Sequence, residues 1–167
     1  MSGSTPVVIS VCAFVASLIF IPYKSEAQET NLLLDYMPPA HAKQLEELMP
    51  GAEVLGGGVR FLELESGTGD LIEEGDRVEA IYTGRFLDGT IFNQKTGRFH
   101  TYHFEVGADP RQIIEGWEVG LPKMQNGGRY LLGIPSQLAY KDKGRRGQVP
   151  PFATVTFEIK ILDVDYR

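Results

Sequence analysis

Aromatic side chains are the residues of this sequence best suited to form a binding site, and they gather in its C-terminal two thirds. Aromatic residues at strand-like spacing more often build a hydrophobic core than a ligand pocket, and the spacing alone allows both. The residues concerned are Tyr82, Phe92, Tyr102, Phe104, Trp117, Tyr140 and Phe157. For Phe104 and Phe157 we expect both roles, with the ring belonging to the core and to a pocket wall.

Side chains suited to covalent or metal chemistry are sparse. The single cysteine, Cys12, lies in an apolar stretch near the N-terminus, which leaves the rest of the chain without a thiolate nucleophile. His100 and His103 lie in a predicted extended segment and point to opposite faces, so they do not make a metal pair. The sequence also has neither zinc-ligand spacing nor a hydrolytic triad. We therefore expect no metal and no cofactor.

The composition indicates one globular domain with an appended segment. The chain has 167 residues, of which 43% are hydrophobic and 23% are charged. Its formal net charge of -6 makes nucleic acid a poor candidate partner, because an acidic domain repels phosphate backbones. One local basic run, residues 141–146, lies between glycines, and we interpret it as a solvated loop rather than an anion site.

An uncharged apolar run covers residues 6–22. Its length lies between that of a signal-peptide core and the roughly 20 residues of a membrane span. Small residues at Ser25 and Ala27 match a cleavage site before Gln28, although no Lys or Arg precedes the run. We interpret residues 1–27 as either a cleaved signal peptide or a retained membrane anchor, with a buried core helix as a third alternative.

Residues 28–57 are predicted to be a linker that contains a short helix. Prolines at 38 and 39, helix-forming residues after them, and Pro50-Gly51 at the end are typical of such a helix. Three apolar residues fall on one face, which we expect to pack on the main domain or on a partner: Leu45, Leu48 and Met49. Gly56–Gly58 is predicted to form a flexible joint.

Residues 58–167 are predicted to be a β-rich domain with one helix. Strand character covers residues 59–64, 76–87, 90–92, 102–106, 129–134 and 153–164. Asp88-Gly89 is a hairpin signal. A helix is predicted over residues 113–121, ended by Pro122, and four of its residues share a buried face: Ile113, Ile114, Trp117 and Leu121. This order predicts an α+β domain whose helix covers one face of an antiparallel sheet.

Several short motifs within this domain occur together in one order. They are Tyr82-Thr83-Gly84, Asp88-Gly89-Thr90-Ile91-Phe92, Ile113-Ile114-Glu115-Gly116-Trp117-Glu118, Leu138-Ala139-Tyr140, Val149-Pro150-Pro151 and Ala153-Thr154-Val155-Thr156-Phe157-Glu158. In this order the set resembles the FKBP family of peptidyl-prolyl isomerases. The resemblance implies a twisted antiparallel β-sheet wrapped around one short α-helix, with a pocket between them.

The resemblance also implies the residues of a proline-binding pocket. Trp117 would form the floor under the substrate proline, while the Ile114 N–H and the Tyr140 hydroxyl would bond substrate carbonyls. The catalytic residues implied are Tyr82, Phe92, Asn93, Ile114, Trp117, Tyr140 and Phe157. The additional substrate-binding residues implied are Tyr102, Phe104, Ile113 and Val149.

Several positions depart from the family pattern. Asn93 stands where the family usually has an Asp, which in family members contacts the tyrosine matched by Tyr82 and the arginine matched by Arg98. Lys141 replaces a Gly, residues 145–148 replace a more apolar edge, and residues 108–111 carry a short expansion. We expect a reduced isomerase activity, because the aromatic floor is kept while the polar rim is altered.

The function implied by the resemblance is cis–trans isomerisation of X–Pro bonds in proline-containing polypeptides, which assists folding. The alternative is a non-catalytic FKBP-like subunit or assembly factor of a membrane protein complex, docked through residues 6–22 and 32–49. Residues 1–27 favour an exported, organelle-lumen or membrane-anchored location. Analogy with single-domain members that carry apolar leaders makes the thylakoid lumen the most specific expectation.

Overall fold

A computed structural model describes residues 37–97 and 99–167 of the chain. The apolar run at residues 6–22 therefore lies outside the described residues. Among the residues described, none of the helices combines the length and the hydrophobicity needed to cross a bilayer.

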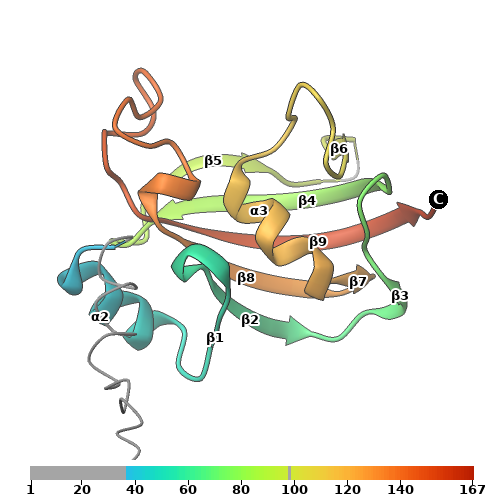
Figure 1. The fold of residues 1–167 in the computed structure, drawn as a ribbon, viewed down its shortest axis with the longest axis horizontal. Coiled ribbons are helices and arrows are strands. Elements are labelled where there is room, and N and C mark those ends of the chain that lie inside the picture. Colours follow the sequence, from blue (N-terminus) through green and yellow to red (C-terminus); the bar gives the residue numbers. More distant parts are fainter. Residues whose placement is uncertain (1–36, 98) are drawn as a thin grey trace, which may run out of the picture.

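An antiparallel sheet forms the centre of the fold (Figure 1). The described residues contribute seven strands to it. Six of them run in the order β1 (Glu53–Val54), β2 (Arg60–Glu65), β8 (Arg129–Ile134), β9 (Val155–Asp165), β4 (Arg77–Phe86) and β5 (Ile91–Lys95). The seventh, β6 (Tyr102–Glu105), also pairs with β4, and β3 (Thr68–Leu71) pairs with β7 (Gln125–Asn126) in a small separate sheet.

The two long central strands carry the alternation that the sequence predicts. On β4, Val78, Ala80 and Tyr82 are buried at every second position, and their partners on β9 are Val164, Ile161 and Ile159. On β9, the predicted inward set Val155, Phe157, Ile159 and Ile161 is buried throughout. Period-two burial of this kind fixes the register of the sheet, because a slip by one residue would turn the apolar face to water.

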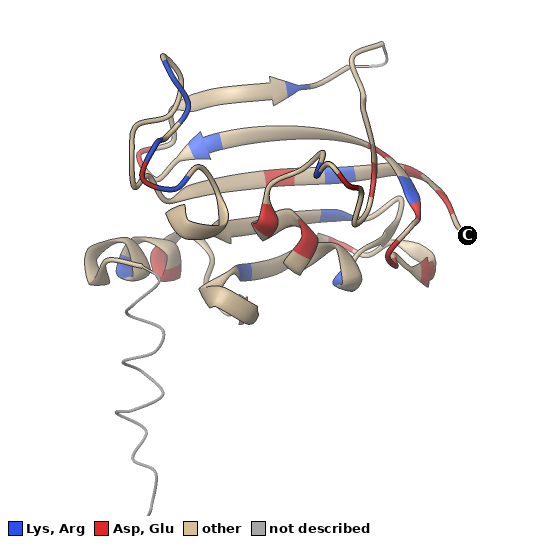
Figure 2. Cartoon of the chain, turned by 45° about the horizontal axis from the view of Figure 1, so that its top comes forward, with Lys and Arg blue, Asp and Glu red and all other residues tan. Residues whose placement is uncertain are grey.

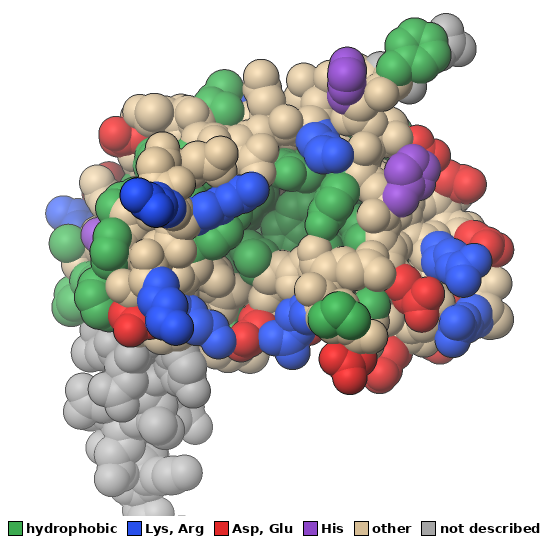
Figure 3. Space-filling view, turned by 90° about the horizontal axis from the view of Figure 1, so that it is seen from above, with side chains coloured by type: hydrophobic (Ala, Val, Ile, Leu, Met, Phe, Trp, Pro, Cys, Tyr) green, Lys and Arg blue, Asp and Glu red, His purple; other side chains and the backbone are tan. Residues whose placement is uncertain are grey.

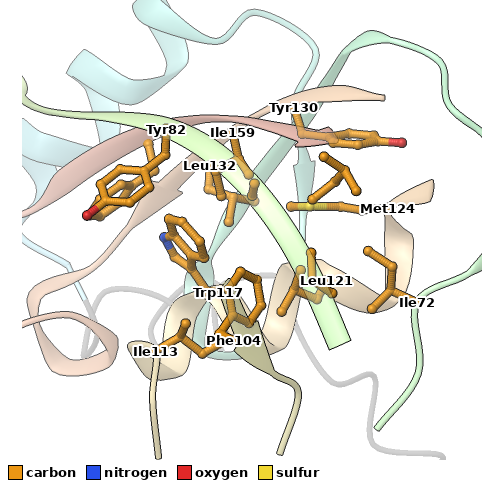
Figure 4. Close-up of a cluster of buried hydrophobic side chains, with 14 of the residues drawn as sticks. Ile72, Tyr82, Phe104, Ile113, Trp117, Leu121, Met124, Tyr130, Leu132 and Ile159 are labelled. Carbon is orange, nitrogen blue, oxygen red and sulfur yellow. The ribbon is translucent and has the colours of Figure 1, made fainter. Parts of the chain in front are cut away.

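Helix α3 (Glu115–Gly120) lies across the concave face of the sheet and continues into the 3-10 turn η2 (Leu121–Lys123) (Figure 1). Two glycines allow this close approach. A Cβ on Gly116 would collide with Ile134, and a Cβ on Gly120 would come within 2.8 Å of Leu132. The core between α3 and the sheet includes Trp117, Leu121, Leu132 and Ile159 (Figure 4).

Helix α2 (Pro39–Leu48) covers part of the opposite face of the sheet. Leu45 and Met49 are 0% and 1% exposed and pack with Leu62 and Leu131. Gly133 on β8 makes room for them, since a Cβ there would lie 2.8 Å from Leu45. The helix predicted in this region thus packs on the main domain.

Three details of the sequence-based prediction are wrong. The helix predicted over residues 113–121 begins only at Glu115, because Ile113 and Ile114 are β-branched and Ile114 has extended dihedrals (φ -71, ψ 151). Leu48 does not share the buried face of α2, since the turn to Met49 leaves it 50% exposed. Gly56–Gly58 is a 3-10 turn, η1, rather than a flexible joint.

The turn η1 is fixed by its surroundings. Leu55 N donates a hydrogen bond to Val59 O at 2.8 Å, and Gly57 lies so close to Leu138 that a side chain would not fit. Leu138 belongs to a third 3-10 turn, η3 (Ser136–Leu138). The sheet itself begins at Glu53, five residues before the boundary that the sequence predicts for the domain.

Candidate active site

A pocket of about 370 Å³ opens between α3 and the central strands. Figure 3 looks down on it and shows hydrophobic side chains at the bottom of a hollow, with Lys and Arg side chains around its rim. The residues that line it are Tyr82, Asn93, Tyr102, Arg111, Gln112, Ile113, Ile114, Trp117, Tyr140, Arg145 and Phe157. Eight of these were predicted as site residues from the sequence.

Trp117 lies at the bottom of the pocket. It is 3% exposed, and its ring meets those of Tyr82 and Phe157 edge-on, with centroids 5.2 and 5.4 Å apart. Figure 4 shows the indole nitrogen on the side of Tyr82. This Nε1–H has no hydrogen-bond acceptor among the residues that the structure describes. Perpendicular aromatic contacts on several sides hold the indole in one orientation.

Three predicted site residues lie behind the pocket wall. Phe92 packs edge-on against Tyr140 and Phe157, with centroids 5.9 and 5.6 Å away. Phe104 is buried between Tyr102 and Trp117, and Val149 is buried beneath the loop that follows Tyr140. These three residues support the lining from outside rather than facing the cavity.

Three tyrosine hydroxyls stand around the opening, and burial raises the pKa of Tyr82, Tyr102 and Tyr140 above its ordinary value. They are therefore protonated at neutral pH and can donate hydrogen bonds. Tyr102 Oη already donates to the Gln112 carbonyl at 2.6 Å. At Tyr82, the positive charge of Arg145 and then the side chain of Asn93 each offset part of the increase in the pKa. The predicted relation of this position to Arg98 lies outside the described residues.

Ile114 contributes a backbone donor. It is the N-cap residue of α3, in extended conformation, and its carbonyl accepts a hydrogen bond from Trp117 N at 3.0 Å. Its own N–H reaches no acceptor among residues 37–97 and 99–167. The side chain is half-buried and lines the pocket next to Trp117.

Ion pairs tie the rim together on one side. Lys141 Nζ lies 2.8 Å from Glu115 Oε1 on α3, and Arg111 lies 2.9 Å from both Glu115 and Glu118. Figure 2 colours the acidic positions of α3 red and the basic positions of the chain blue. The hydrogen bond from Lys141, more than any other contact, lowers the pKa of Glu115. Lys141 thus joins the loop to α3, which was not predicted.

Three lining residues were absent from the predicted site: Arg111, Gln112 and Arg145. Residues 108–111 and 145–148 had been recognised as departures from the family pattern, which was the available signal. Spacing alone does not tell which of two adjacent arginines faces a cavity. Of the two, only Arg145 lines the pocket, and both line an outer groove together with Pro150 and Pro151.

The lining combines aromatic and aliphatic walls with hydroxyl, amide, guanidinium and backbone donors. Such a pocket suits a small apolar ring flanked by carbonyl groups.

Comparison with known proteins decides the family. A family model described as FKBP-type peptidyl-prolyl cis-trans isomerase matches residues 69–162. The chain belongs to this family. An FKBP-type 22 kDa peptidyl-prolyl cis-trans isomerase of Escherichia coli is 34% identical over 124 residues, covering 73% of this chain and 58% of the bacterial protein. The chain thus spans less than two thirds of that relative's length.

Two other FKBP relatives are covered almost completely. FK506-binding protein 1 of Candida glabrata is 34% identical over 115 residues, which cover 68% of this chain and 99% of the yeast protein. The crystal structure of a peptidyl-prolyl cis-trans isomerase from Pseudomonas syringae has a TM-score of 0.65 and 33% identity, covering 81% of this chain and 96% of that one. The predicted α+β FKBP-like fold is thereby confirmed.

Proposed function

We propose that the pocket catalyses cis–trans isomerisation of X–Pro bonds in polypeptides. The observation that carries this proposal is the indole of Trp117 at the bottom of an aromatic pocket that Ile114 and Tyr140 also line. A proline ring is a small apolar group that such a floor accommodates. The carbonyls on either side of it require donors, and the Ile114 N–H and the Tyr140 hydroxyl are the two that we assign to them.

The physical problem for such a catalyst is amide resonance, which sets a barrier of about 18–20 kcal/mol to rotation. At the twisted transition state this resonance is lost, and the bond has less dipolar character than in the planar ground state. A water-poor aromatic pocket disfavours the dipolar planar form and accommodates the twisted one. Catalysis of this type is differential binding, and it needs no covalent intermediate.

We further propose that the activity is lower than that of relatives with an Asp at position 93. Asn93 lines the pocket together with Tyr82, on the strand that pairs with the one carrying Tyr82. An amide interacts with a hydroxyl through a neutral hydrogen bond, which is weaker than the charge-assisted bond that a carboxylate accepts. We therefore expect Asn93 to hold the Tyr82 hydroxyl less firmly than an Asp at this position would.

The test is NMR exchange spectroscopy on a short Leu-Pro peptide with the full chain as catalyst. We expect acceleration of exchange, and a loss of about two- to tenfold in kcat/KM for Tyr140→Phe, since a neutral hydrogen bond contributes about 0.5–1.5 kcal/mol. The matched control is Tyr166→Phe, which removes a hydroxyl bonded to Asp70 O away from the pocket. Absence of acceleration by the parent chain would refute the proposal.

The competing function is that of a non-catalytic subunit of a membrane complex. Asn93 favours it, because the position lacks the usual family carboxylate. The expected docking role of α2 receives no support, since Leu45 and Met49 are already buried against the chain's own sheet. Stoichiometric co-purification with a complex, together with unaccelerated exchange, would favour this function over catalysis.

We propose, from the sequence alone, that residues 6–22 direct the domain to or across a membrane. Mass spectrometry of the native N-terminus distinguishes the two forms of this proposal. A start at Gln28 means a cleaved signal, and a retained residue 6 means an anchor.

A further inference from the structure

Cations surround the pocket even though the chain as a whole is acidic. Arg111 and Arg145 line the opening, Lys141 stands on the loop beside it, and Lys95 Nζ lies 5.2 Å from the centre of the Tyr102 ring. The chain carries a formal net charge of -6, so this local excess of positive charge runs against the overall balance. Figure 3 shows the Lys and Arg side chains on this rim.

Acidic side chains of α3 neutralise part of this charge but not Arg145. Arg111 and Lys141 share the carboxylates of Glu115 and Glu118. Arg145 makes no ion pair with any acidic group in the described part of the chain. A guanidinium that lines an apolar pocket without a carboxylate is therefore available to an anionic group of a ligand.

The backbone of Arg145 is fixed at the edge of the pocket. Its N–H donates to Val149 O, and its carbonyl accepts from Val149 N, both at 2.8 Å. Val149 is buried, and the preceding Gly144 N donates to Tyr140 O at 2.9 Å. The arginine is thus anchored to the core on one side and to the pocket tyrosine on the other.

Arg145 lines the pocket together with Tyr82, Tyr102 and Tyr140. Burial raises the pKa of Tyr82, Tyr102 and Tyr140, and the positive charge of Arg145 offsets part of that increase at each of them. These tyrosines come from β4, β6 and the loop after η3, so Arg145 borders a pocket wall built from three parts of the chain. That location is the mouth of the pocket, above the floor formed by Trp117.

We propose that Arg145 selects X–Pro segments that carry an anionic side chain, a carboxylate or a phosphate, on a residue next to the proline. This inference rests on the function proposed above. With the proline ring on Trp117, the flanking side chains leave the pocket across its rim, where Arg145 stands. Guanidinium groups bind carboxylates and phosphates through paired hydrogen bonds, so a neutral side chain of the same shape would bind less well.

The test compares isosteric peptides that differ in one charge. Four capped peptides place Glu or Gln immediately before or immediately after a single proline, and kcat/KM is measured by NMR exchange with the full chain. We expect the better Glu peptide to exceed its Gln counterpart by about two- to fivefold at low salt, the range of a partly exposed ion pair. The preference should shrink as salt is added. A phosphoserine–serine pair at the preferred position then distinguishes phosphate from carboxylate.

Two variants and one matched control assign the preference to Arg145. Arg145→Gln removes the charge at the pocket, and Asn93→Asp adds a negative charge to the same lining, so both should bring the Glu-to-Gln ratio toward one. Arg146→Gln removes the adjacent charge, which faces the outer groove, and should leave the ratio unchanged. Equal rates for Glu and Gln peptides in the parent, or a ratio retained in Arg145→Gln, would overturn the inference.

The failure of catalysis is distinguishable from the failure of this selectivity. The same peptides are titrated into the full chain and their dissociation constants are measured from chemical shifts. If the chain accelerates cis–trans exchange of none of the peptides, the proposed isomerase function fails. In that case, tighter binding of the Glu peptide than of the Gln peptide, lost in Arg145→Gln, still supports the selectivity. Equal binding of both peptides in that case refutes the selectivity as well.

Discussion

Position 93 places a neutral amide next to Tyr82 in the pocket lining. Asn93 and Tyr82 both line the pocket, from paired strands β5 and β4, and Asn93 carries no formal charge. Phe157 and Trp117 fix the ring of Tyr82 through edge-on contacts, so the amide has only the hydroxyl to orient. The identity of this one residue therefore adjusts the polar rim without disturbing the aromatic floor.

Substitution of Asn93 by Asp tests this view. A carboxylate would accept a charge-assisted bond from the Tyr82 hydroxyl, so we expect kcat/KM on a neutral Leu-Pro peptide to rise about two- to tenfold. NMR exchange spectroscopy measures the rate, and Gln94→Glu on the exposed neighbouring position controls for added charge. A rate that stays level or falls in Asn93→Asp would show that the amide is not what limits the activity.

The aromatic residues were within the reach of sequence reasoning, whereas the orientation of the charged ones was not. Tyr82, Trp117 and Phe157 occur in motifs that fix their place on a strand or helix, so their meeting in one pocket could be predicted. Arg145 and Arg146 are neighbours in a loop, and only the structure shows that Arg145, and not Arg146, lines the pocket. Loop geometry of that kind leaves no periodic signal in the sequence.

At the scale of elements, α3 and the sheet meet through a glycine. Gly116 precedes Trp117, and a methyl group at its α-carbon would collide with the side chain of Ile134 on β8. Helix propensity alone favours Ala over Gly by about 0.5–1 kcal/mol. For Gly116→Ala, helix propensity thus predicts a gain in stability, whereas packing against Ile134 predicts a loss.

We expect Gly116→Ala to destabilise the chain by about 1–3 kcal/mol, the range of an overpacked core, and to lower isomerase activity because Trp117 moves with the helix. Denaturant unfolding followed by circular dichroism gives the free energy of unfolding. A stability equal to or above that of the parent would mean that α3 does not rest on β8 as closely as the structure has it.

Helix α2 is held by its buried residues rather than by its caps. Its N-cap is Pro38, which makes no side-chain capping bond, and His41 Nδ1 lies 3.0 Å from Oγ1 of Thr154, the residue before β9. The sequence predicted the helix and its docking face but misassigned Leu48, which is the last residue of α2 and is 50% exposed, while Met49 lies beyond the helix as its C-cap. Burial is therefore concentrated in Leu45 and Met49.

The pair Leu45→Ala and Leu48→Ala separates the two faces of α2. Leu45 is fully buried, so its truncation should cost about 2–5 kcal/mol of unfolding free energy, provided that α2 unfolds together with the sheet. Leu48 is 50% exposed, and its truncation should cost within about 0.5 kcal/mol. Similar losses in urea unfolding for both variants would contradict the orientation of α2.

At the scale of the whole molecule, buried tyrosines make stability depend on alkaline pH. Burial raises the pKa of Tyr82, Tyr102, Tyr130 and Tyr140. Below the unfolded-state value of 10.0, tyrosine is neutral in both states and these groups leave stability unchanged. Above it, tyrosines of the unfolded chain lose protons that the folded chain retains. This deprotonation stabilises the unfolded state relative to the folded state, so the free energy of unfolding decreases.

We therefore expect the free energy of unfolding to be insensitive to these tyrosines up to about pH 9 and to fall as the pH rises through and beyond 10. Urea unfolding at a series of alkaline pH values measures the slope. Tyr140→Phe removes one titrating group and should make the decline shallower. A stability that increases above pH 10 would mean that the tyrosines ionise more easily in the folded state.

The pocket floor has a practical consequence for the study of this molecule. Trp117 is the single tryptophan of the sequence, and it lies at the bottom of the cavity. Intrinsic indole fluorescence of this chain therefore arises from one site, without background from other indoles. Anything that displaces water above Trp117 changes the environment of the only indole emitter. The protein thus contains its own optical probe of pocket occupancy, and no label needs to be attached.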